Sequence, residues 1–290
     1  MGEREIKRKL FAQGTAAAQA ARIKAAGYIC PLCLESFGIG ALDNGQLTLE
    51  HVPQRSQGGR GIILTCKTCN NTAGHALESH THLRDKQDAF VKGLVGEQVG
   101  LGGQAVAIFG DFKVNIEVIR EDGVTKIKVS KQNDPAAIEG GKAFFERGMK
   151  GDNRKNLKFK VTSRDVYNLR RAHAADLKAA FLTLTAAFGY CYAMDDVSRP
   201  VLEQIANPES KILPKWWGNI QIDPNSIVII EPEGAAVVSF SERAVVLPWP
   251  SRQDNRWAEL LVKQPRTISG LRWNWPKEFE AYLDHLTRES

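Results

Sequence analysis

Four of the five cysteines form two C-x2-C pairs, Cys30 with Cys33 and Cys66 with Cys69. Thiols paired at this spacing supply the four ligands of a tetrahedral Zn²⁺, and in an intracellular chain they bind metal more often than they form disulfides. Four thiolates fill the coordination shell and leave no position for a substrate. We therefore expect one structural Zn²⁺ held by these cysteines.

The segment between the two pairs carries other residues that could do chemistry. An ordinary zinc ribbon has about 15 to 20 residues between its pairs, whereas 32 residues separate Cys33 from Cys66. Within them, Glu50 and His51 stand at the end of an expected strand, and Asn70 directly follows the last cysteine. The metal would tie a helix start beside a strand end, so that a carboxylate, an imidazole and an amide can converge.

Taken together, these residues resemble the HNH endonuclease motif with a zinc knuckle, over roughly residues 28–93. The resemblance rests on the two cysteine pairs and on three further runs: Glu50-His51-Val52-Pro53, Ser56-x-Gly58-Gly59 and Asn70-Asn71-Thr72-Ala73-Gly74. It implies the ββα-metal fold, with His51 as general base and with Glu50 and Asn70 as ligands of a catalytic Mg²⁺ or Mn²⁺. The family's central Asn has no counterpart, because Gly61 stands at its position, five residues before Cys66.

The implied chemistry suits these residue types. A neutral imidazole can take a proton from water near pH 7, and a hard cation on oxygen ligands can stabilise the charge that develops on a phosphodiester. Each residue also has a structural alternative: His51 as a satisfied structural histidine, Glu50 as an exposed strand acid, Asn70 as a helix cap. Further expected nucleic-acid contacts are Arg55, Arg60 and His75, the last being equally compatible with a solvated helix position.

The surrounding pattern predicts the elements that would position this site. We expect a helix over residues 1–26, broken near Gly14, strands over 46–52 and 62–65, and a helix from Asn70 to about Lys92. Five glycines between Gly93 and Gly103 predict a boundary. The predicted domains are therefore an HNH domain over 1–93 and a target-recognition or partner-binding domain over 104–290.

The second part of the chain has element signals but no motif. Asp122-Gly123 predicts a hairpin turn, residues 163–194 a long helix, 226–230 with 235–240 a hairpin, and 276–287 a final helix. The predicted fold class is α+β: an N-terminal zinc-stapled ββα-metal HNH domain followed by a larger α+β domain of unknown fold. All six tryptophans lie in the last third of the chain, which favours a core there over an interface with a protein partner.

Composition sets the expected partner. The 290 residues carry a net charge of +6 and a pI of about 9.0, which is compatible with a polyanionic partner. The resemblance to HNH endonucleases implies DNA more than RNA. Because we find no targeting or membrane-spanning segment, we expect a soluble, cytoplasmic protein with no membrane partner. The expected function is a metal-dependent endonuclease that nicks DNA, with phage defence or restriction suggested by the family's habits. The alternative is a non-catalytic zinc module that binds nucleic acid.

Overall fold

The computed structural model describes residues 2–94, 103–109, 112–121, 124–130, 133–149, 160–163, 166–213, 217–218, 225–230, 234–240, 243–250 and 272–274. These residues mix helices and antiparallel strands, as the predicted α+β class requires. The chain forms two compact units, one from residues 1–81 together with 169–290 and the other from residues 82–168. The boundary predicted between residues 93 and 104 falls inside the second unit.

The first unit begins with the elements that carry the cysteines. They are α1 (Glu3–Ala20), β1 (Tyr28–Ile29), β2 (Ser36–Phe37), α2 (Gly40–Asp43), β3 (Leu47–Val52), η1 (Arg55–Gln57), β4 (Arg60–Cys66), α3 (Lys67–Ala73) and the π-helical turn η2 (Gly74–Glu78). The next helix, α4 (Ser79–Leu94), belongs to the second unit from His82 on. The predicted break at Gly14 is wrong, because α1 continues through it. A side chain at Gly14 would meet the ring of Tyr28, which packs there. The first helix ends at Ala20, earlier than predicted.

The predicted strand pair is confirmed, since β3 and β4 pair antiparallel with Leu47 opposite Cys66. The register shifts between Glu50, opposite Ile63, and His51, opposite Gly61, so Ile62 is an additional residue on β4. One face of β3 carries Leu47 and Leu49 and packs in a core with α1. Because side chains alternate along a strand, the opposite face carries Thr48, Glu50 and Val52.

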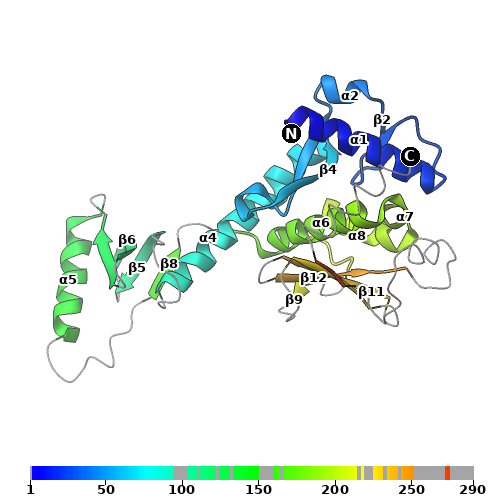
Figure 1. Cartoon of the computed structure of the whole chain (residues 1–290). Coiled ribbons are helices and arrows are strands. Elements are labelled where there is room, and N and C mark those ends of the chain that lie inside the picture. Colours follow the sequence, from blue (N-terminus) through cyan, green and yellow to red (C-terminus); the bar gives the residue numbers. More distant parts are fainter. Residues whose placement is uncertain are drawn as a thin grey trace. The chain divides into compact units, whose positions relative to one another are not determined.

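A buried helix, α6 (Leu169–Phe188), forms the centre of the first unit. One hydrophobic core joins it to β3, β4 and η2 and to strands of a five-stranded antiparallel sheet. Figure 1 shows α6 between that sheet and the elements around β4. The sheet has the order β13-β10-β11-β12-β9 and consists of β9 (Trp217–Gly218), β10 (Ser226–Ile230), β11 (Ala235–Phe240), β12 (Arg243–Pro248) and β13 (Arg272–Asn274).

Short helices follow α6: α7 (Tyr190–Ala193), η4 (Asp196–Ser198) and α8 (Arg199–Ala206). The predicted hairpin over 226–230 and 235–240 is confirmed by the pairing of β10 with β11. The start predicted for the long helix is wrong, because Ser163 ends a strand and α6 begins at Leu169. The helix predicted over 276–287 lies outside the described residues. Of the tryptophans, Trp249 is buried against Phe188 and Tyr192, in agreement with a core role.

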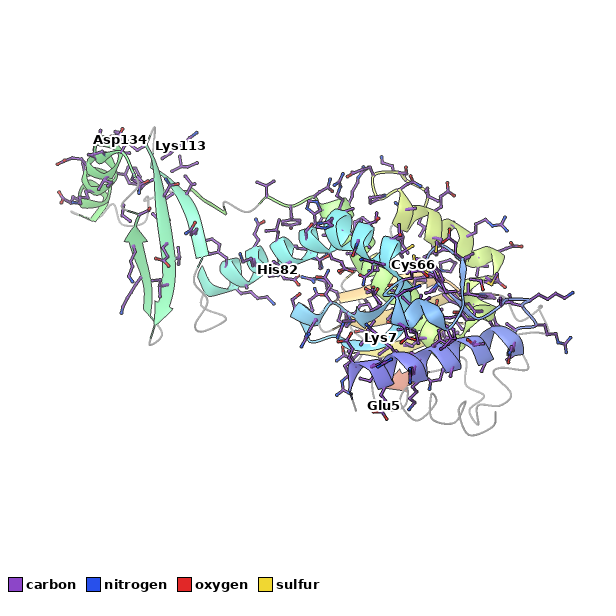
Figure 2. The ribbon with its side chains drawn as sticks, turned by 90° about the horizontal axis from the view of Figure 1, so that it is seen from above. Glu5, Lys7, Cys66, His82, Lys113 and Asp134 are labelled. Atoms are coloured by element: carbon purple, nitrogen blue, oxygen red, sulfur yellow. The ribbon has the colours of Figure 1, made fainter. Side chains whose placement is uncertain are left out.

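The second unit is a four-stranded antiparallel sheet with helices. It contains β5 (Gly103–Phe109), β6 (Phe112–Glu121), β7 (Val124–Val129), α5 (Pro135–Met149) and β8 (Lys160–Ser163), in the sheet order β7-β6-β5-β8. β6 and β7 pair antiparallel with Glu121 opposite Val124, and the two residues of the predicted turn, 122–123, lie outside the described residues. Figure 2 labels Lys113 on β6 and Asp134, which precedes α5. No helix among the described residues is both long and apolar enough to cross a membrane.

Candidate metal centre and the adjoining polar cluster

The four paired cysteines meet at one point of the first unit. Their Sγ atoms all lie within 4.8 Å of one another, and those of Cys33 and Cys66 are 3.8 Å apart. Tetrahedral Zn²⁺ with Zn–S bonds of about 2.3 Å would place its sulfurs roughly 3.8 Å apart. Cys66, labelled in Figure 2, connects the end of β4 to α3. The cluster could therefore hold a metal such as zinc.

The backbone around the cysteines already favours thiolates. The N–H of Cys66 donates to Sγ of Cys30 at 3.3 Å, and the N–H of Cys69 donates to Sγ of Cys66 at 3.4 Å. A hydrogen bond from the Cys69 thiol lowers the pKa of Cys30 to about 5, whereas burial raises the pKa of Cys33 to about 12. Four crowded thiols can ionise together only where a cation neutralises them, so the donor set fits a divalent metal.

Glu50 is buried in a cluster of charged side chains beside the cysteine elements. Its Oε1 lies 2.7 Å from Nζ of Lys178, and its Oε2 accepts a hydrogen bond of 3.0 Å from Oγ1 of Thr65. Nζ of Lys178 also lies 2.5 Å from Oε1 of Glu78. Only 4% of Glu50 and 2% of Lys178 is exposed. Both carboxylate oxygens of Glu50 are therefore engaged by the protein itself.

The charge states in this cluster follow from burial and pairing. Burial alone would lower the pKa of Lys178, but the carboxylates of Glu50 and Glu78 outweigh it and raise that pKa above its ordinary value. Lys178 is therefore a cation. Burial raises the pKa of Glu50, and the ammonium of Lys178 opposes that rise. Two carboxylates thus share a single buried ammonium.

Asn70 lies in the first turn of α3 and faces the same side of β3 as Glu50. Its Nδ2 donates to Oγ1 of Thr48 at 2.9 Å, and Thr48 and Glu50 lie two positions apart on one face of the strand. The prediction that the helix begins at Asn70 is wrong, because α3 begins at Lys67 and Cys66 is its N-cap. The structure thus brings Asn70 and Glu50 to one side of the strand pair.

His51 points away from that side. It is half-buried at the end of β3, on the face that also carries Leu49. The pKa of Glu3, at the start of α1, is lowered chiefly by Lys7 and further by His51 and Arg55, which places both near α1. The structure therefore does not bring the side chains of His51 and Glu50 together. Their predicted catalytic roles stay predictions.

The expected nucleic-acid contacts are on the surface. Arg55 lies in η1, Arg60 at the start of β4 and His75 in η2, and all three are exposed. Arg55 and His51 share the neighbourhood of Glu3. These positions are compatible with phosphate contacts, which no observation tests.

A different group braces the loop that lacks the family's central Asn. A Cβ atom at Gly61 would lie less than 3 Å from the side chain of Leu49, so an amide at this position would require Leu49 to move. Instead, Nε2 of Gln54 donates to the carbonyl of Glu78 at 3.2 Å, and the N–H of Gly59 donates to the carbonyl of Gln54. These hydrogen bonds hold the loop between β3 and β4 in its conformation and attach it to η2.

Lys178 and Glu78 are not among the site residues predicted from the sequence. A signal for Lys178 existed, because it is the only charged residue between Leu177 and Tyr192, a strongly apolar run. A lysine is almost never fully buried unless it is paired, so this position predicts a buried acidic partner. Nothing in the sequence identifies Glu50 and Glu78 as those partners.

A divalent cation on Glu50 and Asn70 does not fit the observed arrangement. Mg²⁺ binds oxygen ligands at about 2.0 to 2.1 Å, and the ammonium of Lys178, 2.7 Å from Oε1 of Glu50, occupies the position beside that carboxylate. Metal binding by Glu50 therefore requires displacement of Lys178. The chain matches no protein-family model, no curated protein and no solved structure closely enough to place it in a known family.

Proposed function

We propose that this chain is a zinc-stapled HNH-type endonuclease that hydrolyses phosphodiester bonds of DNA. The observation that carries the proposal is the cysteine cluster that joins β4 and α3 to the knuckle at Cys30. It fastens two antiparallel strands and the following helix into one body, with His51 at the end of β3. In this proposal the cluster holds a structural Zn²⁺.

His51 is the proposed general base. Its imidazole is half-buried, so it can reach solvent while the strand holds it in place. Arg55 and Arg60 are exposed at the two ends of the loop that joins β3 and β4. A phosphate held by the guanidinium group of Arg55, which shares the neighbourhood of Glu3 with His51, would lie near the imidazole, which then accepts a proton from the attacking water.

A divalent cation, Mg²⁺ or Mn²⁺, supplies charge neutralisation in this class of reaction. Asn70 presents its amide to the Glu50 side of the strands, and it is a proposed ligand together with Glu50 once Lys178 has left that carboxylate. The proposed catalytic state therefore differs from the observed arrangement at Lys178 and also at β3, where His51 and Glu50 face opposite sides of the strand.

A non-catalytic zinc module that binds nucleic acid is the second candidate. The burial of Glu50 in its contact with Lys178 favours it, because a permanently paired carboxylate serves stability and not metal binding. Both candidates predict that the four cysteines bind zinc, but only the nuclease predicts hydrolysis of phosphodiester bonds.

Incubation with supercoiled plasmid separates them. The nuclease proposal expects cleavage with Mg²⁺ or Mn²⁺, none with EDTA, and restoration by Mg²⁺ while the zinc stays bound. Single-stranded DNA, duplex DNA and RNA of one sequence should be compared in parallel to define the substrate. Retarded migration of intact DNA, with no cleavage under any metal, would favour the non-catalytic module.

A further inference from the structure

We propose that Lys178 serves as a tethered cation in place of a divalent metal between Glu50 and Glu78, so that the observed arrangement is a resting state of the site. We call the contact of Lys178 with these two carboxylates the lysine bridge. The inference rests on the proposed function only in taking Glu50 as a metal-binding position. It concerns which cation the carboxylates hold before nucleic acid arrives.

Geometry is the first argument. Nζ of Lys178 lies 2.7 Å from an oxygen of Glu50 and 2.5 Å from an oxygen of Glu78. A cation at that position therefore has two carboxylate oxygens next to it from different elements, β3 and η2. Oxygen donors on two carboxylates are what Mg²⁺ and Mn²⁺ bind.

Charge is the second argument. One ammonium faces two carboxylates, so the three side chains together carry a net negative charge. The ammonium is buried, because only 2% of Lys178 is exposed. Buried carboxylates without a counter-charge are strongly unfavourable. Removing the ammonium would leave two neighbouring carboxyl groups that must take up either a proton or another cation.

Topology is the third argument. Lys178, in α6, is 128 positions from Glu50 in sequence, whereas Glu50 and Glu78 belong to the segment that carries the cysteines. α6 packs against η2, β3 and β4 through the shared core. Withdrawal of the Lys178 side chain from Glu50 and Glu78 would remove the cation while α6 itself stays packed in this core. The lysine bridge therefore makes access to Glu50 depend on a residue from outside the segment that carries the cysteines.

Mn²⁺ binding to the zinc-loaded full chain tests the inference without any cleavage assay. Free Mn²⁺ is measured by electron paramagnetic resonance as it is titrated into the parent, Lys178→Met and Lys178→Arg. Lys178→Met removes the charge and keeps a long side chain, whereas Lys178→Arg keeps the charge. We expect Lys178→Met to bind one Mn²⁺ at least about tenfold more tightly than the parent, and Lys178→Arg to match the parent. The gain should vanish when Glu50→Gln is added.

A folded Lys178→Met chain that binds no more Mn²⁺ than Lys178→Arg would overturn the inference. If circular dichroism shows that Lys178→Met does not fold, the Mn²⁺ titrations of the parent and of Glu50→Gln are compared instead. A tethered cation leaves their Mn²⁺ titrations alike, whereas loss of a binding event in Glu50→Gln shows that Glu50 already holds metal and refutes the bridge. Neither result depends on cleavage, so a failed plasmid assay would reject the nuclease and leave this test standing.

Discussion

Nζ of Lys178 lies 2.7 Å from Oε1 of Glu50, although 128 positions separate the two residues in the chain. This contact joins the middle of α6 to the end of β3, and Glu78 in η2 completes it. It makes the central helix a part of the candidate site. The elements around the cysteines are therefore coupled to the C-terminal sheet through a buried charge as well as through the hydrophobic core.

Lys178→Met should destabilise the first unit by about 3 to 5 kcal/mol, since breaking a buried ion pair leaves uncompensated charge. The free energy of unfolding is measured with urea. Lys7→Met is the matched control, because Lys7 contacts Glu3 at 2.8 Å on the surface, and it should leave the unfolding midpoint unchanged. Equal effects of the two substitutions would show that the buried contact does not stabilise the fold.

Cys66→Ser should abolish zinc binding and the folded state of the segment that carries the cysteines. The parent is expected to contain about one zinc per chain by metal analysis, and binding energy at such a site is folding energy. Cys191→Ser is the control, because Cys191 is not part of the cluster and should retain zinc. A Cys66→Ser chain with an unchanged melting curve would contradict the structural role.

Local patterns in the sequence predict the local structure around the cysteines well. The knuckle spacing predicts the sulfur cluster, and alternation from Leu47 to Val52 predicts β3. The antiparallel pairings of β6 with β7 and of β10 with β11 follow from turn signals and β-branched runs in the sequence. Each of these features depends on residues close together in the chain or on one repeated spacing.

The parts that could not be predicted depend on long-range packing. No local pattern reveals that residues 169–290 pack with residues 1–81, or that Glu50 is buried against Lys178. Alternation would have indicated that Glu50 and His51 face opposite sides of β3, since neighbours on a strand diverge. The resemblance to the HNH motif instead predicted that the two side chains converge on one site. Whether they act together stays a prediction.

His51→Ala should reduce cleavage by roughly 10²- to 10⁴-fold, the usual cost of removing a general base, while zinc content and the unfolding midpoint stay unchanged. His82→Ala is the control, because His82 is exposed at the start of the second unit and has no proposed role. Initial rates on plasmid DNA are compared at equal protein and Mg²⁺. A His51→Ala chain that cuts as fast as the parent would refute the proposed mechanism.

Stability should fall as the pH rises above about 10. Burial raises the pKa of Tyr28, Tyr190 and Tyr192 above the ordinary value. The unfolded chain releases these protons from about pH 10 upward, whereas the folded chain retains them. Stability is therefore complete below pH 10 and is lost above it, by about 1.4 kcal/mol per pH unit for each tyrosine.

Tyr190→Phe removes one of these titrations and should lower the slope by that amount. Tyr190 donates to the carbonyl of Ile29, so the substitution also lowers stability at every pH. The slope of the unfolding free energy against pH is therefore the measurement, and not its level at one pH. Parallel slopes for Tyr190→Phe and the parent would show that Tyr190 already titrates normally in the folded chain.

The products of cleavage should be nicks. The sequence contains one Glu-His pair and one Asn directly after a second cysteine pair, hence one proposed active site per chain. One site with one nucleophile breaks one strand in each event, and a simultaneous double-strand break needs a second protomer in the opposite orientation. Supercoiled plasmid should therefore become open circle before any linear form appears. The ends should carry 5′-phosphate and 3′-hydroxyl groups, because attack by water displaces the 3′ oxygen. Gel analysis over time at low enzyme concentration measures the order of products, and linear DNA without an open-circle intermediate would show that two active sites act together.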